Sequence, residues 1–331
     1  MRHGGNVWEG QPADWLDFSA NLRPEGTPDW VMATMQGALA QACYYPDRAM
    51  RAARAGLAAY LGVAEGCVLP TAGGAAAIDL ALSVRRGAVH VQMPTFGEYA
   101  ERARVHGRAV VTDQPMQAGD TAVLCNPNNP TGALCSPAEV LARYEAVRRQ
   151  GGELLVDEAF IDYCPTQTVR HAVQDGLTVV GSLTKILCIP GVRLGYLCGS
   201  PARIAQVASR AVTWSLNVLA SAIAAELPLH RADIEADAAL NQQRAERFAR
   251  KLQAIGAQTA AHPVPFLLVR FPRDMTEAVQ RLHQQHLLVR TCASFGLPAD
   301  TLRLAVKTDA ENDRLLQALT DALNREDYHA R

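Results

Sequence analysis

Short apolar runs alternate with stretches typical of helices between residues 68 and 200. The apolar runs cover residues 88–94, 121–127, 153–160, 178–183 and 193–199. Runs of this length are typical of buried strands, and their alternation with helices favours a mostly parallel sheet with helices on both faces. The sequence therefore predicts an α/β fold, in which ligand sites lie outside the carboxyl ends of the strands.

One connecting stretch carries clear helix boundaries. Ser136 is a good N-cap, Pro137 suits the first helical position, and a run rich in Ala, Leu and Val reaches Gln150. Gly151 and Gly152 follow at once. Because glycine readily adopts the left-handed conformation that ends helices, we predict that the helix stops there.

A change of pattern near residue 230 divides the chain, whose 331 residues exceed the usual size of one domain. Beyond it the sequence predicts a long polar helix (232–255), strands near 266–271, 287–291 and 301–306, a helix over 274–285 and a final helix from 309. We predict a large domain over 29–220 and a smaller α+β domain over 221–331. Residues 1–28 are rich in Gly, Pro and Trp without a period, which indicates an extended arm rather than a packed element.

Composition and charge exclude several partners. The formal net charge of -1 offers no field for nucleic acid or an anionic membrane, and no apolar run is long enough to cross a bilayer. The N-terminus lacks the apolar core of a signal peptide, so we expect a cytoplasmic protein. The eight cysteines contain no CxxC pair, which favours neither disulfides nor a metal site.

Only three lysines occur, at positions 185, 251 and 307. Lys185 directly follows an apolar strand, in SLTK, whereas Lys251 lies on the polar helix and Lys307 follows a strand near the C-terminus. An amine at the carboxyl edge of a sheet, partly desolvated and near cationic groups, has a lowered pKa and can form an imine. Lys185 is therefore the candidate amine nucleophile, with an ordinary surface lysine as the alternative.

Three motifs around this lysine resemble a known cofactor site. SLTK-x7-R-x-G (182–195), PNNPTG (127–132) and VDEAF (156–160) occur in the order and spacing of the class I/II aminotransferases, particularly the histidinol-phosphate aminotransferase group. The resemblance covers nearly the whole chain. It implies the fold type I architecture and pyridoxal 5'-phosphate (PLP) as the cofactor, bound to Lys185 as an imine.

The resemblance assigns three residues to the cofactor ring. Asp157, which ends an apolar strand, corresponds to the carboxylate that keeps the ring nitrogen protonated, so that the ring can accept electrons. Asn129 corresponds to the donor to the ring hydroxyl, and Phe96, in PTFGEY, to the aromatic side chain that stacks on the ring. The structural alternatives are a strand-end cap for Asp157, a turn residue for Asn129 and a core residue for Phe96.

Further positions are assigned to the cofactor phosphate. Gly73 and Gly74 open a predicted helix, whose N-terminus offers backbone N–H donors. Ser182 and Arg193 correspond to phosphate ligands of the family, and arginine can contact phosphate in a bidentate manner. Tyr45, in YYPD, matches a tyrosine that reaches the phosphate from the neighbouring subunit. The resemblance therefore implies a homodimer with shared active sites.

The chain also departs from the family pattern. The group usually has a tyrosine where Phe160 stands, giving the ring hydroxyl a second hydrogen bond, and polar residues where Ala75 and Ala76 stand. Phosphate binding would then depend on backbone amides, Ser182 and Arg193.

Motifs of the N-terminal arm favour one reaction. HGGN (3–6) and DFSANLRPEG (17–26), with DEAFID (157–162) and WSLN (214–217), resemble the threonine-phosphate decarboxylases of the cobalamin pathway. The resemblance implies decarboxylation of L-threonine O-3-phosphate to (R)-1-aminopropan-2-yl phosphate and CO2. Because PLP can labilise any of three bonds at the α-carbon, substrate orientation decides among the reactions.

A phosphorylated amino acid needs two anion sites, and arginine suits both of its groups. Arg290 and Arg303 lie on neighbouring strand-like segments of the small domain. The resemblance also places Asn21 on the substrate side and lets His3 and Asn6 cover the substrate phosphate. The alternatives are a surface salt bridge for Arg290, a turn cap for Asn21 and disorder for the terminal residues.

Two other functions stay open. A transaminase acting on histidinol phosphate or a similar amino donor would use the same lysine, although the arm motif and Phe160 argue against it. The other is a PLP-binding regulatory or accessory protein without turnover. No helix-turn-helix extension or basic face supports a DNA-binding regulator.

Overall fold

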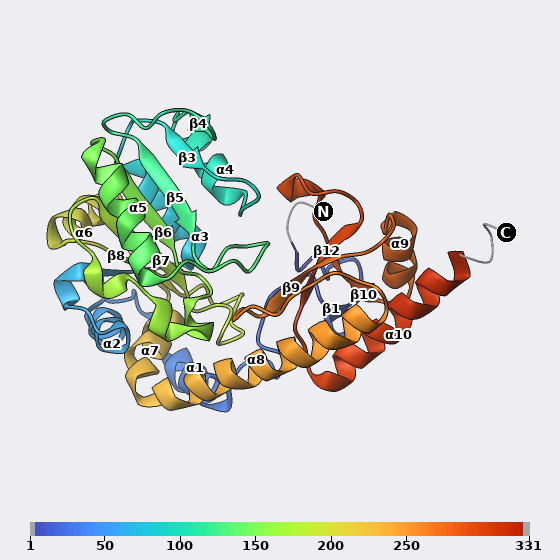
Figure 1. Ribbon diagram of the computed structural model, residues 1–331. Helices are drawn as coiled ribbons and strands as arrows, with labels where there is room; N and C mark the ends of the chain where they lie inside the picture. The colour runs from blue at the N-terminus through green and yellow to red at the C-terminus, as the bar shows by residue number, and fades with distance from the viewer. Residues whose placement is uncertain (1–3, 327–331) are drawn as a thin grey trace.

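The computed structural model describes residues 4–326 and contains a seven-stranded sheet (Figure 1). The strand order is β2 (Val68–Thr71), β8 (Gly195–Cys198), β7 (Leu177–Ser182), β6 (Glu153–Asp157), β5 (Thr121–Cys125), β3 (Val89–Val91) and β4 (Val110–Val111). β8 runs antiparallel to both neighbours, and every neighbouring pair from β7 to β4 is parallel. This topology confirms the predicted α/β fold with a mostly parallel sheet.

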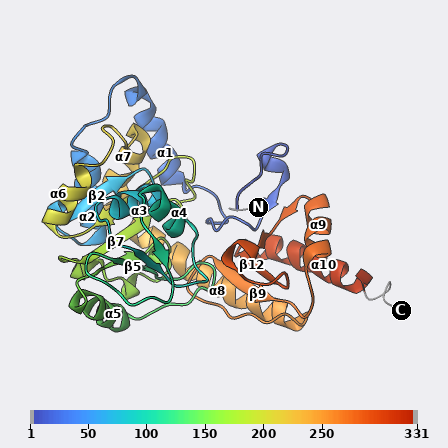
Figure 2. The same cartoon turned by 90° about the horizontal axis from the view of Figure 1, so that it is seen from above.

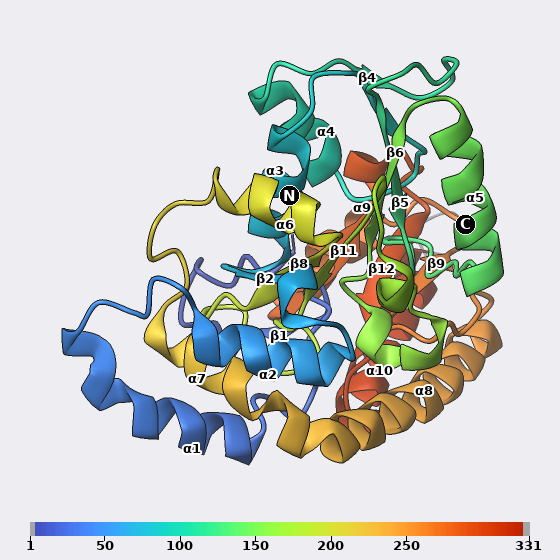
Figure 3. The same cartoon turned by 90° about the vertical axis from the view of Figure 1, so that its left-hand side faces the viewer.

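Helices cover both faces of the sheet, so every residue of β6 and β7 is buried. On one face Leu154 and Val156 share a core with α2 (Arg51–Leu61) and α7 (Val218–Glu226). Figure 3 shows α1 (Asp29–Ala38) beside these two helices. On the other face Leu155 shares a core with α3 (Gly74–Ser83), α4 (Glu98–Val105) and α6 (Pro201–Ala208).

Helix α5 (Pro137–Arg149) has the boundaries that its sequence predicts. The Ser136 Oγ accepts a hydrogen bond from the Glu139 N–H at 3.4 Å, and the Glu139 carboxylate accepts one from the Ser136 N–H at 2.7 Å. This reciprocal pair satisfies two helix donors that otherwise lack partners. Gly151 lies just past the helix at φ 75°, a conformation that glycine adopts without strain.

A smaller unit is built around a three-stranded antiparallel sheet, in the order β11 (Arg290–Thr291), β12 (Thr301–Ala305) and β9 (Phe266–Arg270). Helices α9 (Thr276–Gln284) and α10 (Asp309–Glu326) pack on it around a separate apolar core. The single strand predicted near 287–291 is two short strands, because β10 (Leu287–Leu288) and β11 pair with different partners.

Helix α8 (Arg231–Ala254) connects the two units and contributes to both cores (Figures 1 and 2). Its first half places Ile234 and Ala238 in the core of the large sheet, and its second half places Phe248 and Leu252 in the small core. One continuous helix therefore fixes the distance between the two sheets. The domain limits at 29–220 and 221–331 stay predictions.

The N-terminal arm is more ordered than its sequence predicts. Strand β1 (Leu16–Asp17) pairs in parallel with β10, and Phe18 is fully buried in the small core. The Trp15 ring stacks on His286 with ring centroids 5.0 Å apart and lies tilted against His283 with centroids 4.7 Å apart. The expectation of an arm without packed elements is wrong for this half, because a two-residue strand is too short to show a period and its partner lies far along the chain.

Two features are absent from residues 4–326. No helix there combines the length and apolarity of a membrane span. No group of three or more His, Cys, Asp or Glu side chains in that range is arranged to hold a metal ion. The eight cysteines are free thiols. The predicted cytoplasmic location stays a prediction.

Candidate active site

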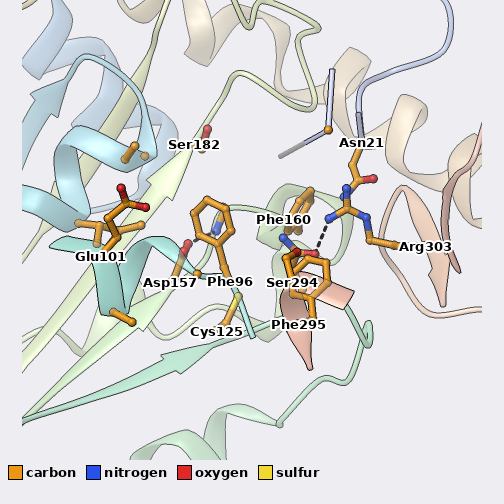
Figure 4. Close-up of a pocket in the computed structure, with 18 of the residues that line it drawn as sticks. Asn21, Phe96, Glu101, Cys125, Asp157, Phe160, Ser182, Ser294, Phe295 and Arg303 are labelled. Carbon is orange, nitrogen blue, oxygen red and sulfur yellow. Dashed lines mark hydrogen bonds between the residues drawn. The ribbon is translucent and has the colours of Figure 1, made fainter. Parts of the chain in front are cut away.

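A cavity of about 630 Å³ opens between the carboxyl edge of the large sheet and the small sheet. Ten of the residues that the sequence singles out line it: Asn21, Gly74, Phe96, Asn129, Asp157, Ser182, Lys185, Arg193, Arg290 and Arg303. Figure 4 shows Asp157 and Phe96 near the centre of the cavity, with Ser182 toward one end and Arg303 and Asn21 toward the other. The sheet therefore brings together residues that are up to 282 positions apart, since Arg303 is that far from Asn21.

Lys185 lies three residues after the end of β7 and lines the cavity, as predicted. Burial, followed by the nearby positive charges of Arg193 and Arg303, lowers the pKa of its amine to about 8. The other two lysines do not line the cavity, and Lys251 forms an ion pair with Asp313. An amine with this pKa is largely available as a neutral nucleophile at slightly alkaline pH.

Asp157 is the last residue of β6 and is 3% exposed. Its Oδ1 accepts a hydrogen bond from the Ala159 N–H at 2.9 Å, and its Oδ2 accepts one from the Tyr99 O–H at 2.6 Å. Burial raises the pKa of this carboxyl, while both hydrogen bonds and the charge of Lys185 act in the opposite direction. The Asp157 carboxylate therefore fits both interpretations, because it caps the end of the strand by a backbone hydrogen bond and also faces the cavity.

Asn129 lies in the loop after β5 and joins the two sheets. Its Oδ1 accepts a hydrogen bond from the Arg303 Nη1 at 2.6 Å. Because this contact uses the amide oxygen, it leaves the amide N–H donors for a ligand, which fits the predicted bond to a ring hydroxyl. Phe160, in place of the family tyrosine, packs edge to face on Phe266 with ring centroids 5.2 Å apart.

The phosphate end of the cavity is narrow at two glycines. Gly73 precedes α3 at φ 86°, and a Cβ there would lie 2.5 Å from the Nη2 of Arg193. A Cβ on Gly74 would lie 3.1 Å from the Cβ of Ser182. The Ser182 Oγ shares a hydrogen bond of 2.7 Å with the Thr184 hydroxyl. These contacts bring a helix N-terminus, two hydroxyls and a guanidinium together, which is an arrangement suited to phosphate.

Two arginines form the opposite end. Arg290 and Arg303 are partners in the register of β11 and β12, and each is at most 5% exposed. The Arg303 Nη2 donates to the Ser19 carbonyl at 2.7 Å, while its Nε has no hydrogen-bond partner among residues 4–326. Burial, and then Arg290, lower the pKa of Arg303 to about 10. Arg290 donates to the Ser294 Oγ at 2.6 Å.

No carboxylate within the described range forms a salt bridge with Arg303. A buried guanidinium without an acidic partner is costly unless an anion joins it. The ring of Phe295 lies 5.9 Å from the Arg303 guanidinium and 5.2 Å from that of Arg290. The Phe295 ring and the two guanidinium groups together make a site for a ligand with anionic groups.

Three predicted residues of the described range do not line the cavity. Gly73 is next to the lining residues rather than among them. Tyr45 is 81% exposed and its ring lies tilted against Trp214 with ring centroids 4.6 Å apart. Asn6 is exposed and donates to the Glu9 carboxylate at 3.2 Å. His3 lies outside the described residues.

Sequence reasoning missed Tyr99, Thr184, Ser19, Ser294 and Phe295. Thr184 was visible inside the SLTK motif, and Tyr99 inside PTFGEY. Ser19 was visible inside DFSANLRPEG, whereas Ser294 and Phe295 carry no motif signal, because their place in the site depends on how the small sheet packs. The Oδ1 of Asn21 is buried without a hydrogen-bond partner within residues 4–326, as expected of a group that meets a ligand.

The donor set fits PLP. A buried carboxylate, an amine with a lowered pKa, an amide donor, an aromatic ring and a phosphate cradle face one cavity, and glycines occupy the positions where a Cβ would crowd Ser182 and Arg193. Together with the topology of the large sheet, this site defines a PLP-dependent enzyme of fold type I.

Comparison with known proteins identifies the family. The chain belongs to the class I and II aminotransferase family, whose model matches residues 13–319. It is 32% identical to the threonine-phosphate decarboxylase of Salmonella typhimurium, with 97% of this chain and 96% of the relative covered. A histidinol-phosphate aminotransferase of Methylibium petroleiphilum is 31% identical, with 95% and 91% covered. The crystal structure of L-threonine-O-3-phosphate decarboxylase from Porphyromonas gingivalis matches with a TM-score of 0.83 at 23% identity, covering 93% of this chain and 99% of that chain.

Proposed function

We propose that the protein decarboxylates L-threonine O-3-phosphate to (R)-1-aminopropan-2-yl phosphate and CO2, with PLP as cofactor, as a step of cobalamin biosynthesis. The pair of buried arginines at one end of the cavity carries this proposal, because the substrate has two anionic groups and the cavity offers two guanidinium groups opposite the cofactor residues. The similarity to a threonine-phosphate decarboxylase over nearly the whole chain supports it.

Arg303 is the better placed of the two for the substrate carboxylate. Its hydrogen bond to Asn129 holds it against the residue assigned to the cofactor ring. Arg290, with the Ser294 hydroxyl, then takes the substrate phosphate. Asn21 and, from the arm, Asn6 and His3 complete the substrate side in this proposal.

The assignment of the cofactor residues follows from the same cavity. When bound, PLP supplies an electron sink for the electron pair left on the α-carbon after a bond breaks. Asp157 would hold the ring nitrogen, Asn129 the ring hydroxyl and Phe96 the face of the ring. The N-terminus of α3 with Gly73 and Gly74, together with Ser182 and Arg193, would bind the cofactor phosphate.

Substrate orientation selects the bond. Arg303 and Arg290 hold the two ends of the substrate and turn the bond between the α-carbon and the carboxylate perpendicular to the ring. The carboxylate leaves as CO2, its bonding pair stays on the α-carbon, and a proton replaces it there. The Lys185 Nζ is the acid placed to deliver that proton.

An assay of both products tests the reaction. L-Threonine O-3-phosphate labelled in its carboxylate should release labelled CO2, with kcat/KM at least about 100-fold above that for threonine, because the phosphate is a steering group. If no labelled CO2 is released, and glutamate forms from histidinol phosphate and 2-oxoglutarate, the protein is an aminotransferase instead. The similarity to a histidinol-phosphate aminotransferase is the observation that keeps this second candidate open.

We also propose a homodimer with shared sites. Tyr45 does not line the cavity of its own chain but is 81% exposed beside Trp214, which suits a side chain that reaches a partner's phosphate end. Mixing the inactive variants Lys185→Ala and Tyr45→Ala should restore activity, because each mixed dimer contains one intact site. Full activity of a monomeric wild-type protein, or no restoration after subunit exchange, would contradict the shared site.

A further inference from the structure

Tyr99 links the cofactor aromatic to the cofactor carboxylate. It is the second residue of α4 and lies three positions after Phe96, whose ring it meets edge to face with centroids 5.7 Å apart. Its side chain is fully buried. One short segment therefore delivers both the ring assigned to cover the cofactor and the phenol that contacts Asp157.

The phenol can act toward Asp157 only as a donor. Burial, and then the negative charge of Asp157, raise the pKa of the Tyr99 hydroxyl well above its ordinary value, so the proton stays on the tyrosine. The donated hydrogen bond measures 2.6 Å to Oδ2, within the range of charge-assisted O–H···O contacts.

Asp157 depends on such donors more than an exposed carboxylate does. Within residues 4–326 no cation forms a salt bridge with it. The titratable groups that face it are Tyr99 from α4, Cys125 opposite it on β5, and Lys185 after β7. Burial and Asp157 itself raise the pKa of the Cys125 thiol to about 12, so this neighbour brings no charge. Besides the charge of Lys185, two hydrogen bonds, from Tyr99 and the Ala159 N–H, stabilise the carboxylate in its ionised form.

We propose that Tyr99 is a positioning residue that acts through Asp157: its hydroxyl holds Oδ2 and keeps the carboxylate ionised and oriented toward the cofactor ring nitrogen. Each carboxylate oxygen has two lone pairs, so the one hydrogen bond that each accepts leaves a lone pair for the cavity. This inference rests on the proposed function only for the measurements of turnover, because PLP affinity is measured without a substrate.

The chain offers a matched control for a purely structural tyrosine. Tyr144 on α5 is also buried, and its hydroxyl donates to the Asp175 carbonyl at 2.8 Å, away from the cavity. Tyr99→Phe and Tyr144→Phe each remove one oxygen and keep a buried ring. We therefore expect both variants to fold, and their unfolding midpoints provide the check.

The test compares PLP affinity and pH dependence. In Tyr99→Phe we expect the dissociation constant of PLP from the apoprotein to rise roughly tenfold to hundredfold at neutral pH, the factor that a hydrogen bond to a charged group represents. The acid limb of PLP affinity and of kcat/KM should move to higher pH, because the pKa of Asp157 rises when a donor to its ionised form is lost. Tyr144→Phe should show neither change.

A double variant separates action through Asp157 from an independent effect. Tyr99→Phe combined with Asp157→Asn should bind PLP no more weakly than Asp157→Asn alone, because the hydroxyl then has no carboxylate to stabilise. Additive losses, or a Tyr99→Phe protein that matches Tyr144→Phe in affinity and acid limb, would overturn the inference. If the wild-type protein has no decarboxylase activity but Tyr99→Phe shows the expected loss of PLP affinity, only the proposed function is contradicted.

Discussion

The cofactor half and the substrate half of the cavity are built in different ways. The cofactor half uses residues at the ends of neighbouring strands of one sheet, such as Asp157 after β6 and Lys185 after β7. The substrate half combines the arm, through Ser19 and Asn21, with the small sheet, through Arg303. The first is fixed by the topology of one core, whereas the second depends on how two cores are held together. Substrate choice can therefore change while the cofactor site stays constant.

The two halves also differ in charge. The cofactor half contains an acid, an amine and the Arg193 guanidinium, whose charges partly balance. At the substrate end Arg303 lies beside Arg290 and forms no salt bridge among residues 4–326, although the charge of Asp17 acts to raise its pKa. In the cofactor half the opposite charges stabilise one another before any ligand binds. In the substrate half the excess positive charge favours an anionic ligand.

The largest effect should come from the cofactor half. Lys185→Ala removes the only cavity amine, so we expect loss of the visible absorbance of covalently held PLP and loss of measurable turnover. Absorbance spectroscopy and the CO2 assay measure both. Lys251→Ala, which removes a surface ion pair with Asp313, should leave both unchanged. If Lys185→Ala retains the absorbance and the turnover, a residue other than Lys185 holds the cofactor.

A substitution in the substrate half should spare the cofactor. Arg303→Gln removes a buried charge that faces the substrate, and truncating one partner of a buried charge pair costs about 2–5 kcal/mol, so kcat/KM should fall by roughly two to three orders of magnitude. The PLP absorbance should remain. Arg270→Gln, on the exposed end of β9 in a pair with Asp300, is the control. Equal losses in both variants would remove the distinction between the two halves.

Two adjacent carboxylates of the cofactor half differ in their surroundings, because Asp157 lines the cavity and Glu158 does not. Glu158 follows Asp157 but does not line the cavity, and it accepts hydrogen bonds from the Thr168 hydroxyl at 2.5 Å and the Val169 N–H at 2.8 Å. Burial raises its pKa from 4.5 to about 7. The folded protein therefore binds one more proton than the unfolded chain between these values, and its stability falls as pH rises through that window.

Urea unfolding between pH 5 and pH 8 measures this contribution, which is on the order of 3 kcal/mol. Glu158→Gln should flatten the pH dependence, because the amide does not titrate. The surface variant Glu145→Gln should retain the wild-type slope. An unchanged slope in Glu158→Gln would assign the pH dependence to another group.

The smallest expected effect is a shift in the pH of cofactor uptake. Because the pKa of Lys185 is lowered to about 8, the neutral amine increases as pH rises through 8, and the rate at which the apoprotein attaches PLP should increase with it. Arg193→Gln removes a positive charge that contributes to the lowering, so the midpoint should move to higher pH. Stopped-flow absorbance gives the midpoint, and a midpoint that does not move would leave burial and Arg303 as the causes of the lowered pKa.

Local patterns in the sequence determined the cofactor half. Alternating apolar runs predicted the sheet, and motifs such as SLTK and VDEAF placed Lys185 and Asp157 at its carboxyl edge. The capped helix after Ser136 was predicted for the same reason. These features depend on residues near in sequence, whose conformational preferences and burial patterns can be recognised without knowing what packs against them.

Only the tertiary structure decided how the arm and the small sheet meet that edge. The pairing of β1 with β10, the hydrogen bond from Arg303 to Asn129 and the one from Tyr99 to Asp157 join residues 58 to 271 positions apart. Contacts of this kind leave no period or motif in the chain, because each depends on the packing of elements that a local pattern does not describe. The Asp157 carboxylate was predictable from its motif, but the hydrogen bond that it accepts from Tyr99 is decided by the packing of α4 against the sheet.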